Sequence, residues 1–200
     1  LHTAITNALE QAAITLRDGD VLAISSKYVA ISEGRVVKLD AVTVSQQALD
    51  LSERYNIEPR LAQLVVDEAD HIFGGIPLGY LLTARGGVIA PNAGIDRSNI
   101  PDGQAVLLPE RPFASARAVR LMLRERQGVD VGVILTDSWL MPGRWGTTGV
   151  AIAADGFEVV QDERGKDDLF GNPMTVTQRG IADSLSVCAQ TVMGERDEST

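Results

Sequence analysis

The sequence predicts an α+β fold in which helices and short antiparallel strands are mixed along 200 residues. Some segments carry apolar residues at helical spacing, while others are short β-branched runs typical of strands. The two kinds of segment do not alternate strictly, which indicates an α+β or mixed α/β fold. Apolar residues make up 44% of the chain, enough for a buried core in one unit over residues 1–200 or in two subdomains.

Helices are predicted where apolar residues recur every three or four positions. The first segment contains Leu1, Leu9 and Leu16 at this spacing, and the Asp-Gly-Asp turn that follows ends it. Another segment has Pro59 in its first turn, where a proline costs no helical hydrogen bond. The predicted helices span residues 1–16, 45–55, 59–68, 111–126 and 181–193.

Strands are predicted where β-branched and apolar residues form short runs. Residues 131–136 have the length and composition of a buried strand. Residues 21–26 form a strand that residues 28–32 could continue, and residues 35–38 could pair back with it. The remaining predictions are a glycine-rich hairpin at residues 74–90, strands at residues 106–108 and 147–154, and a polar loop at residues 162–172.

Composition argues against several kinds of partner. The net charge of −9 argues against a nucleic-acid partner, because binding to phosphate backbones requires a basic face. No apolar run reaches the length of a membrane span, so we expect no membrane partner. Cys188 is the one cysteine, which excludes an internal disulfide and favours a cytoplasmic protein. We expect its thiol to be buried in the last helix.

Oxygen-bearing side chains follow the predicted strand at residues 131–136. Asp137 and Ser138 come directly after it, and Asp96 lies in a second acidic turn at residues 92–99. Carboxylate and hydroxyl oxygens are hard ligands that suit Mg²⁺ or Mn²⁺ and the phosphates behind the metal. The two turns therefore predict a metal–nucleotide site, although an aspartate after a strand is more often a helix cap or turn former.

Positive and hydroxyl groups elsewhere offer contacts to phosphate. Ser26 and Lys27 close the strand at residues 21–26, where they could bind phosphate or form a solvated turn. Arg144 follows a glycine and could clamp an anionic substrate. The chain has no P-loop and no Gly-x-Gly-x-x-Gly motif. Its two histidines, His2 and His71, are too few for a zinc site.

The order of these motifs resembles that of a known family, the γ-glutamyl ligases of coenzyme F420. The matching segments, in order, are Gly-Asp-Val-Leu-Ala-Ile-Ser-Ser-Lys, Asn-Ala-Gly-Ile-Asp-Arg-Ser-Asn, Leu-Thr-Asp-Ser, Asp-Leu-Phe-Gly and Val-Met-Gly-Glu. Members of that family use GTP to add L-glutamate to a deazaflavin phosphodiester precursor. The resemblance covers nearly all of the chain, and it implies an uncommon fold of two intertwined subdomains and a homodimer.

The resemblance implies roles for residues at matching positions. The divalent-metal ligands, for Mg²⁺ or Mn²⁺, fall on Asp96, Asp137, Ser138 and Glu195. Lys27 and Arg144 would add fixed positive charge at the reacting groups, and the family's chemistry allows a monovalent cation such as K⁺. The GTP contacts fall on Ser26, Lys27, Asn99, Met193, Gly194, Glu195, Arg196, Asp197, Glu198, Ser199 and Thr200.

Three departures from the family pattern leave two alternatives open. Ile31 stands where the family commonly has a second lysine, and Met141 stands where an arginine is usual. The family's most N-terminal nucleotide contact would lie upstream of Leu1, and both termini look truncated relative to the family. The alternatives are a related nucleotide-dependent amide ligase with a different acceptor, and a non-catalytic metal- or nucleotide-binding module.

Overall fold

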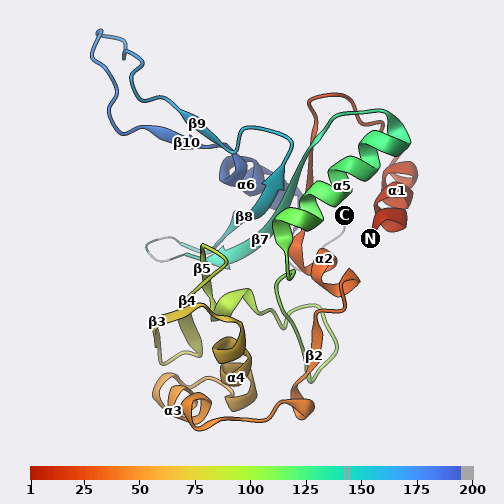
Figure 1. The fold of residues 1–200 in the computed structure, drawn as a ribbon. Coiled ribbons are helices and arrows are strands. Elements are labelled where there is room, and N and C mark those ends of the chain that lie inside the picture. Colours follow the sequence, from red (N-terminus) through yellow and green to blue (C-terminus); the bar gives the residue numbers. More distant parts are fainter. Residues whose placement is uncertain (142, 144, 195–200) are drawn as a thin grey trace. The chain divides into compact units, whose positions relative to one another are not determined.

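The computed structural model describes residues 1–141, 143 and 145–194, and it is a mixed α+β structure (Figure 1). The chain divides into two compact units. Unit 1 comprises Leu1, Ser25–Pro112 and Trp139–Gly146, and unit 2 comprises His2–Ile24, Phe113–Ser138 and Thr147–Thr200. Each unit is therefore assembled from separate stretches of the sequence.

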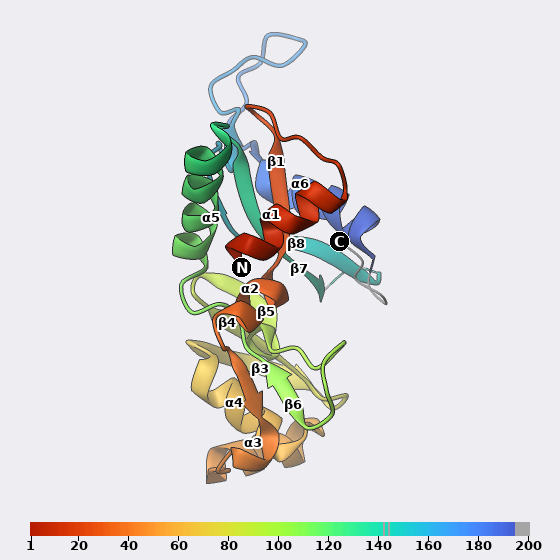
Figure 2. The same ribbon diagram turned by 90° about the vertical axis from the view of Figure 1, so that its right-hand side faces the viewer.

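Unit 2 is built on a three-stranded sheet with the strand order β1-β7-β8. These strands are β1 (Val21–Ser25), β7 (Gly132–Leu140) and β8 (Thr147–Asp155). Helices α5 (Pro112–Gln127) and α6 (Ile181–Met193) lie on opposite faces of this sheet (Figure 2). The first part of β7 is an unbroken run of buried residues, which fits a strand that is covered on both faces.

Close backbone contact and ion pairs attach the two helices to the sheet. Gly149 of β8 lies against the backbone of Ser186 in α6, and a Cβ atom on this glycine would be 2.4 Å from the Ser186 carbonyl oxygen. On the other face, Arg120 of α5 forms ion pairs with Asp130 at 2.7 Å and with Asp155 of β8 at 3.3 Å. The backbone of α6 therefore lies directly against the sheet at Gly149.

Unit 1 contains two small antiparallel sheets. The first has the strands β3 (His71–Ile76), β4 (Tyr80–Arg85) and β5 (Val88–Pro91) in that order, and the second pairs β2 (Val36–Lys38) with β6 (Gln104–Val106). The helical elements of the unit are α2 (Ser26–Ser32), α3 (Gln46–Tyr55), α4 (Pro59–Glu68) and the short 3₁₀ turns η1 (Leu39–Ala41) and η2 (Asn92–Gly94). The region predicted as a single hairpin, residues 74–90, thus contributes to three strands.

The predicted helices are present with bounds close to those expected. Helices α4 and α6 occupy the predicted residues, while α5 is shifted by one residue and α1 (His2–Gln11) ends earlier. Helix α3 starts one residue late because Ser45 is its N-cap and accepts a backbone hydrogen bond at 3.3 Å. Pro59 opens α4, whose N-cap is Glu58. Within the described residues, none of these helices combines the length and hydropathy needed to cross a membrane.

Two predictions for the region after β1 are wrong. Residues 28–32 do not continue the strand but belong to α2, in which Val29 and Ala30 are fully buried. Strand β2 pairs with β6 and not with β1. The β-branched residues that favoured a strand pack in a helix here, because tertiary burial overrides local propensity.

Strand β7 extends beyond its predicted end at residue 136 and reaches Leu140. Trp139 is 5% exposed, so the strand is buried again after the two polar residues Asp137 and Ser138. Asp137 and Ser138 therefore lie inside a strand and not directly after one.

A second expectation about unit 2 is also wrong, because Cys188 is exposed on α6.

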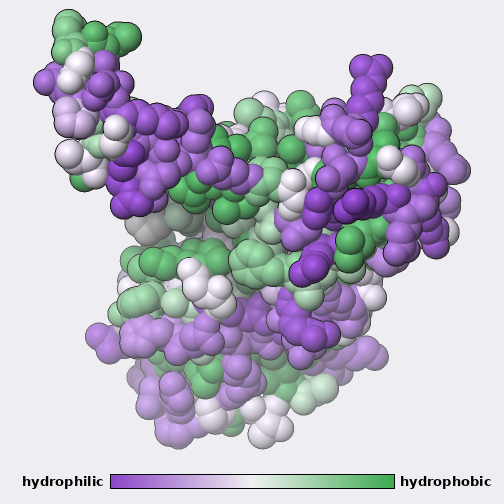
Figure 3. Space-filling model, turned by 45° about the horizontal axis from the view of Figure 1, so that its top comes forward, coloured by the Kyte–Doolittle hydropathy of each residue, from purple (hydrophilic) through white to green (hydrophobic). Residues whose placement is uncertain are grey.

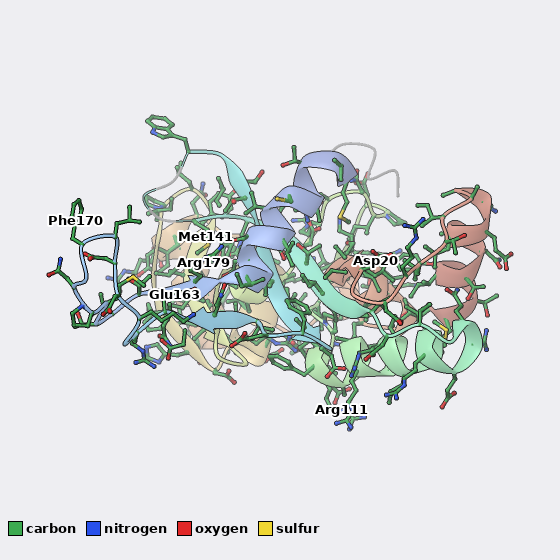
Figure 4. All side chains as sticks on the ribbon, turned by 90° about the horizontal axis from the view of Figure 1, so that it is seen from above. Asp20, Arg111, Met141, Glu163, Phe170 and Arg179 are labelled. Atoms are coloured by element: carbon green, nitrogen blue, oxygen red, sulfur yellow. The ribbon has the colours of Figure 1, made fainter. Side chains whose placement is uncertain are left out.

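A long hairpin arm lies between β8 and α6 in the sequence. Strands β9 (Val160–Asp162) and β10 (Gln178–Gly180) pair at its base, and backbone hydrogen bonds extend to Asp168 and Asn172. Leu169 and Phe170 at the tip are 99% and 89% exposed. Figure 3 shows this tip as an apolar patch on a hydrophilic stalk. In Figure 4, Phe170 lies at the far end of the arm, away from Glu163 and Arg179 near its base.

Candidate functional site

The acidic turn at residues 92–99 begins with a left-handed segment. Asn92, Ala93 and Gly94 have φ angles of +49°, +56° and +71°. A Cβ atom on Gly94 would lie 2.6 Å from the Leu108 side chain, so glycine is required there for space as well as for conformation. For Asn92 and Ala93, this conformation costs on the order of 1 kcal/mol each, so the surrounding structure must hold it.

Two buried side chains hold the left-handed segment in place. Asn92 Oδ1 accepts a hydrogen bond from a backbone amide of β4 at 2.8 Å, and its Nδ2 donates to the Gly79 carbonyl at 3.2 Å. Thr83 Oγ1 donates to the Ala90 carbonyl at 2.6 Å and accepts from the Ala93 amide at 2.8 Å. Strand β4 thus fixes the backbone that leads to Asp96.

We expect Thr83→Val to lower the free energy of unfolding by about 2 kcal/mol, because valine leaves the buried Ala93 amide without its acceptor. Denaturant unfolding measures the loss, and amide exchange at Ala93 should accelerate. Thr136→Val is the matched control, since both threonines are fully buried but Thr136 donates only a long hydrogen bond of 3.4 Å. Equal losses in the two variants would contradict the role assigned to Thr83.

Asp96 itself is held through its backbone. Its amide donates to the Val106 carbonyl at 2.9 Å, and its carbonyl accepts from the Val106 amide at 2.8 Å. The preceding residue, Ile95, packs against two buried apolar clusters of unit 1. The carboxylate therefore projects from a backbone that is fixed on one side by β6 and on the other by the core.

Hydrogen bonds and an ion pair surround the Asp96 carboxylate. Its Oδ1 accepts from the Ser98 amide at 2.7 Å, and its Oδ2 accepts from the Ser98 hydroxyl at 3.0 Å. Lys27 Nζ lies 2.8 Å from Oδ2, and it also donates to the carbonyl of Ser98 at 3.3 Å and to its hydroxyl at 3.2 Å. The ammonium of Lys27, from α2, is thus bonded to both Asp96 and Ser98.

These contacts keep Asp96 ionised. Burial is the largest single influence on the pKa of its carboxyl and raises it. The ammonium of Lys27 and the amide and hydroxyl of Ser98 together outweigh burial, so the pKa lies below the ordinary value of an aspartate. At neutral pH the pair is a carboxylate facing an ammonium.

The structure brings Lys27 and Asp96 together, as a phosphate contact and a metal ligand in one site would require. Ser26 begins α2 and is 1% exposed, so it does not form the solvated turn considered as an alternative. Asn99 is exposed and has a φ angle of +51°. Ser98 was missed by the sequence reasoning, and the Asp-x-Ser spacing of an Asx turn is the signal that could have found it.

The other predicted acidic ligand lies in unit 2. Asp137 is half-buried in β7, and its Oδ1 accepts from the Ser138 amide at 2.8 Å. The residues that flank Asp137 and Ser138 in the sequence, Thr136 and Trp139, are both buried. The convergence of Asp137 with Asp96, which belongs to unit 1, stays a prediction.

Part of the predicted site falls at the end of α6 and in the loop after β7. Met193 ends the helix, and Gly194 is its C-cap with a φ angle of +78°. The other predicted contacts lie outside the described residues; they are Arg144, Glu195, Arg196, Asp197, Glu198, Ser199 and Thr200.

The donor chemistry of the described residues suits a hard divalent cation. Asp96 and Ser98 in unit 1, and Asp137 and Ser138 in unit 2, offer the carboxylate and hydroxyl oxygens that Mg²⁺ and Mn²⁺ prefer. In the part of the chain that the structure describes, no group of three or more His, Cys, Asp or Glu residues is placed to hold a metal. That these oxygens form a divalent-metal site stays a prediction.

Comparison with known proteins identifies the family. A family model described as "F420-0:Gamma-glutamyl ligase" matches residues 1–200. The chain belongs to this family. The "Coenzyme F420:L-glutamate ligase" of Methanopyrus kandleri is 43% identical over 185 residues, which are 92% of this chain and 73% of the relative. The protein of the same name from Methanothermobacter thermautotrophicus is 35% identical over 197 residues, which are 97% of this chain and 77% of the relative. The one from Halorubrum lacusprofundi is 38% identical over 195 residues, which are 94% of this chain and 74% of the relative.

Membership of the F420-0:gamma-glutamyl ligase family confirms the resemblance that the motifs predicted. The match runs through both units of the structure. The turn that carries Asp96 and the strand that carries Asp137 therefore both lie in the region that the family model matches.

Proposed function

We propose that the chain is a GTP-dependent γ-glutamyl ligase that adds L-glutamate to the deazaflavin precursor F420-0. The observation that carries the proposal is the family match over the whole chain. The site around Asp96 supports it, because a cation and a carboxylate from distant segments lie 2.8 Å apart. Groups of this kind are suited to bind a metal and phosphates together.

The proposed reaction activates a carboxylate, which is otherwise a poor electrophile. The γ-phosphoryl group of GTP passes to the carboxylate of the precursor and leaves GDP and an acyl phosphate. The amine of L-glutamate attacks the acyl carbon, and the bond between that carbon and the phosphate oxygen breaks. Inorganic phosphate and a proton leave, and the amide remains.

The residues of the chain would bind and orient these anions. Lys27 and Arg144 would neutralise phosphate and carboxylate charge, and Ser26, Asn99 and residues 193–200 would contact the nucleotide. Asp96, Asp137, Ser138 and Glu195 would hold Mg²⁺ or Mn²⁺, which when bound supplies positive charge to the transferring phosphoryl group. Water must be excluded from the acyl phosphate, which hydrolyses readily.

Turnover with defined substrates tests this proposal. Phosphate release from GTP should require the precursor, L-glutamate and a divalent cation together, and the product should gain the mass of one or more glutamyl residues. Release that needs no glutamate, or binding of GTP without turnover, would contradict the ligase and favour a non-catalytic module. ATP in place of GTP tests the choice of nucleotide in the same assay.

A related ligase with a different acceptor is the second candidate. Met141 stands at a position where an arginine is usual in the family, so a less anionic acceptor could fit there. Turnover with another carboxylic acid and none with the deazaflavin precursor would favour this candidate.

We also expect a homodimer. The region around β3–β5 exposes several large apolar side chains, among them Phe73 (55%), Ile76 (51%), Leu78 (72%) and Ile89 (50%). A small sheet does not bury such a surface by itself, and we expect a partner subunit or the second domain to cover it. Light scattering at micromolar concentration should give twice the chain mass of 21.4 kDa. Leu78→Ser should shift the population toward the monomer, whereas a monodisperse wild-type monomer would refute the dimer.

A further inference from the structure

We propose that Arg35 is a positioning residue for nucleotide binding, because it joins the two elements of unit 1 that carry predicted nucleotide contacts. Ser26 and Lys27 lie on α2, and Asn99 lies in the acidic turn at residues 92–99. The inference rests on the proposed function, in which these three residues contact GTP. It adds a residue that acts on the nucleotide only through the groups that bind it.

The backbone of Arg35 is bonded to the end of α2. The Gly34 amide donates to the Ile31 carbonyl at 3.0 Å. The Arg35 amide donates to the Ala30 carbonyl at 2.9 Å. Together with the φ angle of +74° at Gly34, these two bonds form a Schellman motif, which satisfies the last carbonyls of a helix. The side chain of Arg35 therefore starts from a point that is fixed relative to α2.

The same residue holds the segment that follows β6. Its carbonyl accepts from the Leu107 amide at 3.0 Å, and its Nε donates to the Leu108 carbonyl at 3.1 Å. Leu108 is 4% exposed, and a Cβ on Gly94 would lie 2.6 Å from its Cδ1 atom. Because Gly94 belongs to the left-handed segment of the acidic turn, Arg35 is joined to that turn through one buried side chain.

An ion pair orients the guanidinium group of Arg35. Its Nη2 lies 2.6 Å from Glu68 Oε2 at the end of α4, and Arg85 Nη2 lies 2.7 Å from the same oxygen. The side chains of Arg35 and Glu68 are only 22% and 15% exposed. A guanidinium group is planar and rigid, so the bond to Glu68 through Nη2 also fixes the direction of Nε. In this structure Nε is directed at the Leu108 carbonyl.

The side chain extends a connection that backbone pairing makes only in part. The pairing of β2 with β6 has Val36 opposite Val106, whose backbone holds that of Asp96. Beyond this pair, Arg35 bonds the next two residues of the other strand through its carbonyl and its Nε. Without the guanidinium group, we expect α2 and the acidic turn to stay in contact but to be held less precisely. A displacement of about 1 Å between groups that bind one ligand is costly.

Nucleotide binding and steady-state kinetics of the full chain test the inference. Methionine retains a long stem but offers no donor to Leu108 or Glu68. Arg35→Met should raise the KM for GTP and the dissociation constant of a non-hydrolysable GTP analogue about ten-fold, with kcat lowered less than about two-fold. Amide exchange at Asp96 and Val106 should accelerate in the same variant. Arg35→Lys should weaken binding of the analogue only about three-fold, because an ammonium bonds one of the two partners, and it serves as the test if the methionine variant does not fold.

Arg85→Met is the matched control. It removes the same charge from the same oxygen of Glu68, and the Arg85 side chain is 16% exposed. Arg85 is the last residue of β4, beyond Leu81 and Thr83, which hold the left-handed segment. The denaturation midpoint should fall by similar amounts in the two methionine variants, while Arg85→Met leaves the KM for GTP unchanged.

The outcomes separate the inference from the proposed function. If the wild type binds and turns over GTP, but substitution at Arg35 weakens nucleotide binding no more than Arg85→Met does, the ion pair is only structural. The inference is then wrong and the proposed function stands. A wild-type chain that neither binds the analogue nor turns over GTP overturns both.

Discussion

Asp137→Asn is expected to lower kcat by at least about 100-fold while the fold is retained. Asparagine has nearly the same shape, and its Oδ1 can still accept from the Ser138 amide, as Asp137 does at 2.8 Å. It lacks the charge that the proposed site uses to hold a divalent cation. A 100-fold loss corresponds to about 2.7 kcal/mol of activation free energy, within the several kcal/mol that a bound metal contributes.

Asp155→Asn is the control for that variant. Asp155 lies on β8 and makes an ion pair with Arg120 at 3.3 Å, with 28% of its side chain exposed. Its loss should cost no more than about 1 kcal/mol of unfolding free energy and should leave kcat unchanged. Circular dichroism and thermal melting establish that both variants are folded, and Mn²⁺ binding isolates the metal. Near-normal metal-dependent turnover in Asp137→Asn would remove Asp137 from the ligand set.

Helices could be predicted where the sequence carries local boundary signals. Pro59 marks the start of α4, and Gly180 and Gly194 flank α6, so both helices have the predicted bounds. Helix α2 carries such a signal at its end, where Gly34 follows the C-cap with a φ angle of +74°. The helix has only seven residues, however, among them the β-branched Val29 and Ile31, and its helical state depends on the burial of Val29 and Ala30. Information of that kind is tertiary and cannot be taken from spacing alone.

The candidate site was predicted residue by residue but not as an arrangement. Asp96 and Lys27 could be selected because acids in polar turns and lysines after strands suit metals and phosphates. The direct pairing of the two side chains could not be predicted, since it depends on α2 and on the left-handed backbone of residues 92–94. Asp137 was expected beyond the end of its strand because two polar residues interrupt the apolar run. The burial of Trp139 shows that the strand continues through them.

The contact between α6 and β8 is another feature that the sequence does not reveal, and it gives the largest expected effect on stability. Gly149→Ala should lower the free energy of unfolding by about 3 kcal/mol. The added methyl would lie 2.4 Å from the carbonyl oxygen of Ser186 and 2.8 Å from the amide nitrogen of Val187. These are backbone atoms, so the whole helix must move. Asp183 resists that movement, because its Oδ1 accepts from the Ala151 amide of β8 at 2.8 Å.

Two further variants show whether the backbone contact is the cause. Gly180→Ala makes the same chemical change at the N-cap of α6, where φ is −75° and the nearest atom to the new Cβ is Asp183 Oδ2 at 3.9 Å. It should change the unfolding free energy by no more than about 1 kcal/mol. The Ser186 hydroxyl is buried without a hydrogen-bond partner among the described residues, so Ser186→Ala alone should be neutral or slightly stabilising. Because the clash is with the backbone of residue 186, Gly149→Ala combined with Ser186→Ala should remain as unstable in denaturant as Gly149→Ala alone. Rescue by the double substitution would mean that the serine side chain, and not the helix backbone, limits how closely α6 approaches the sheet.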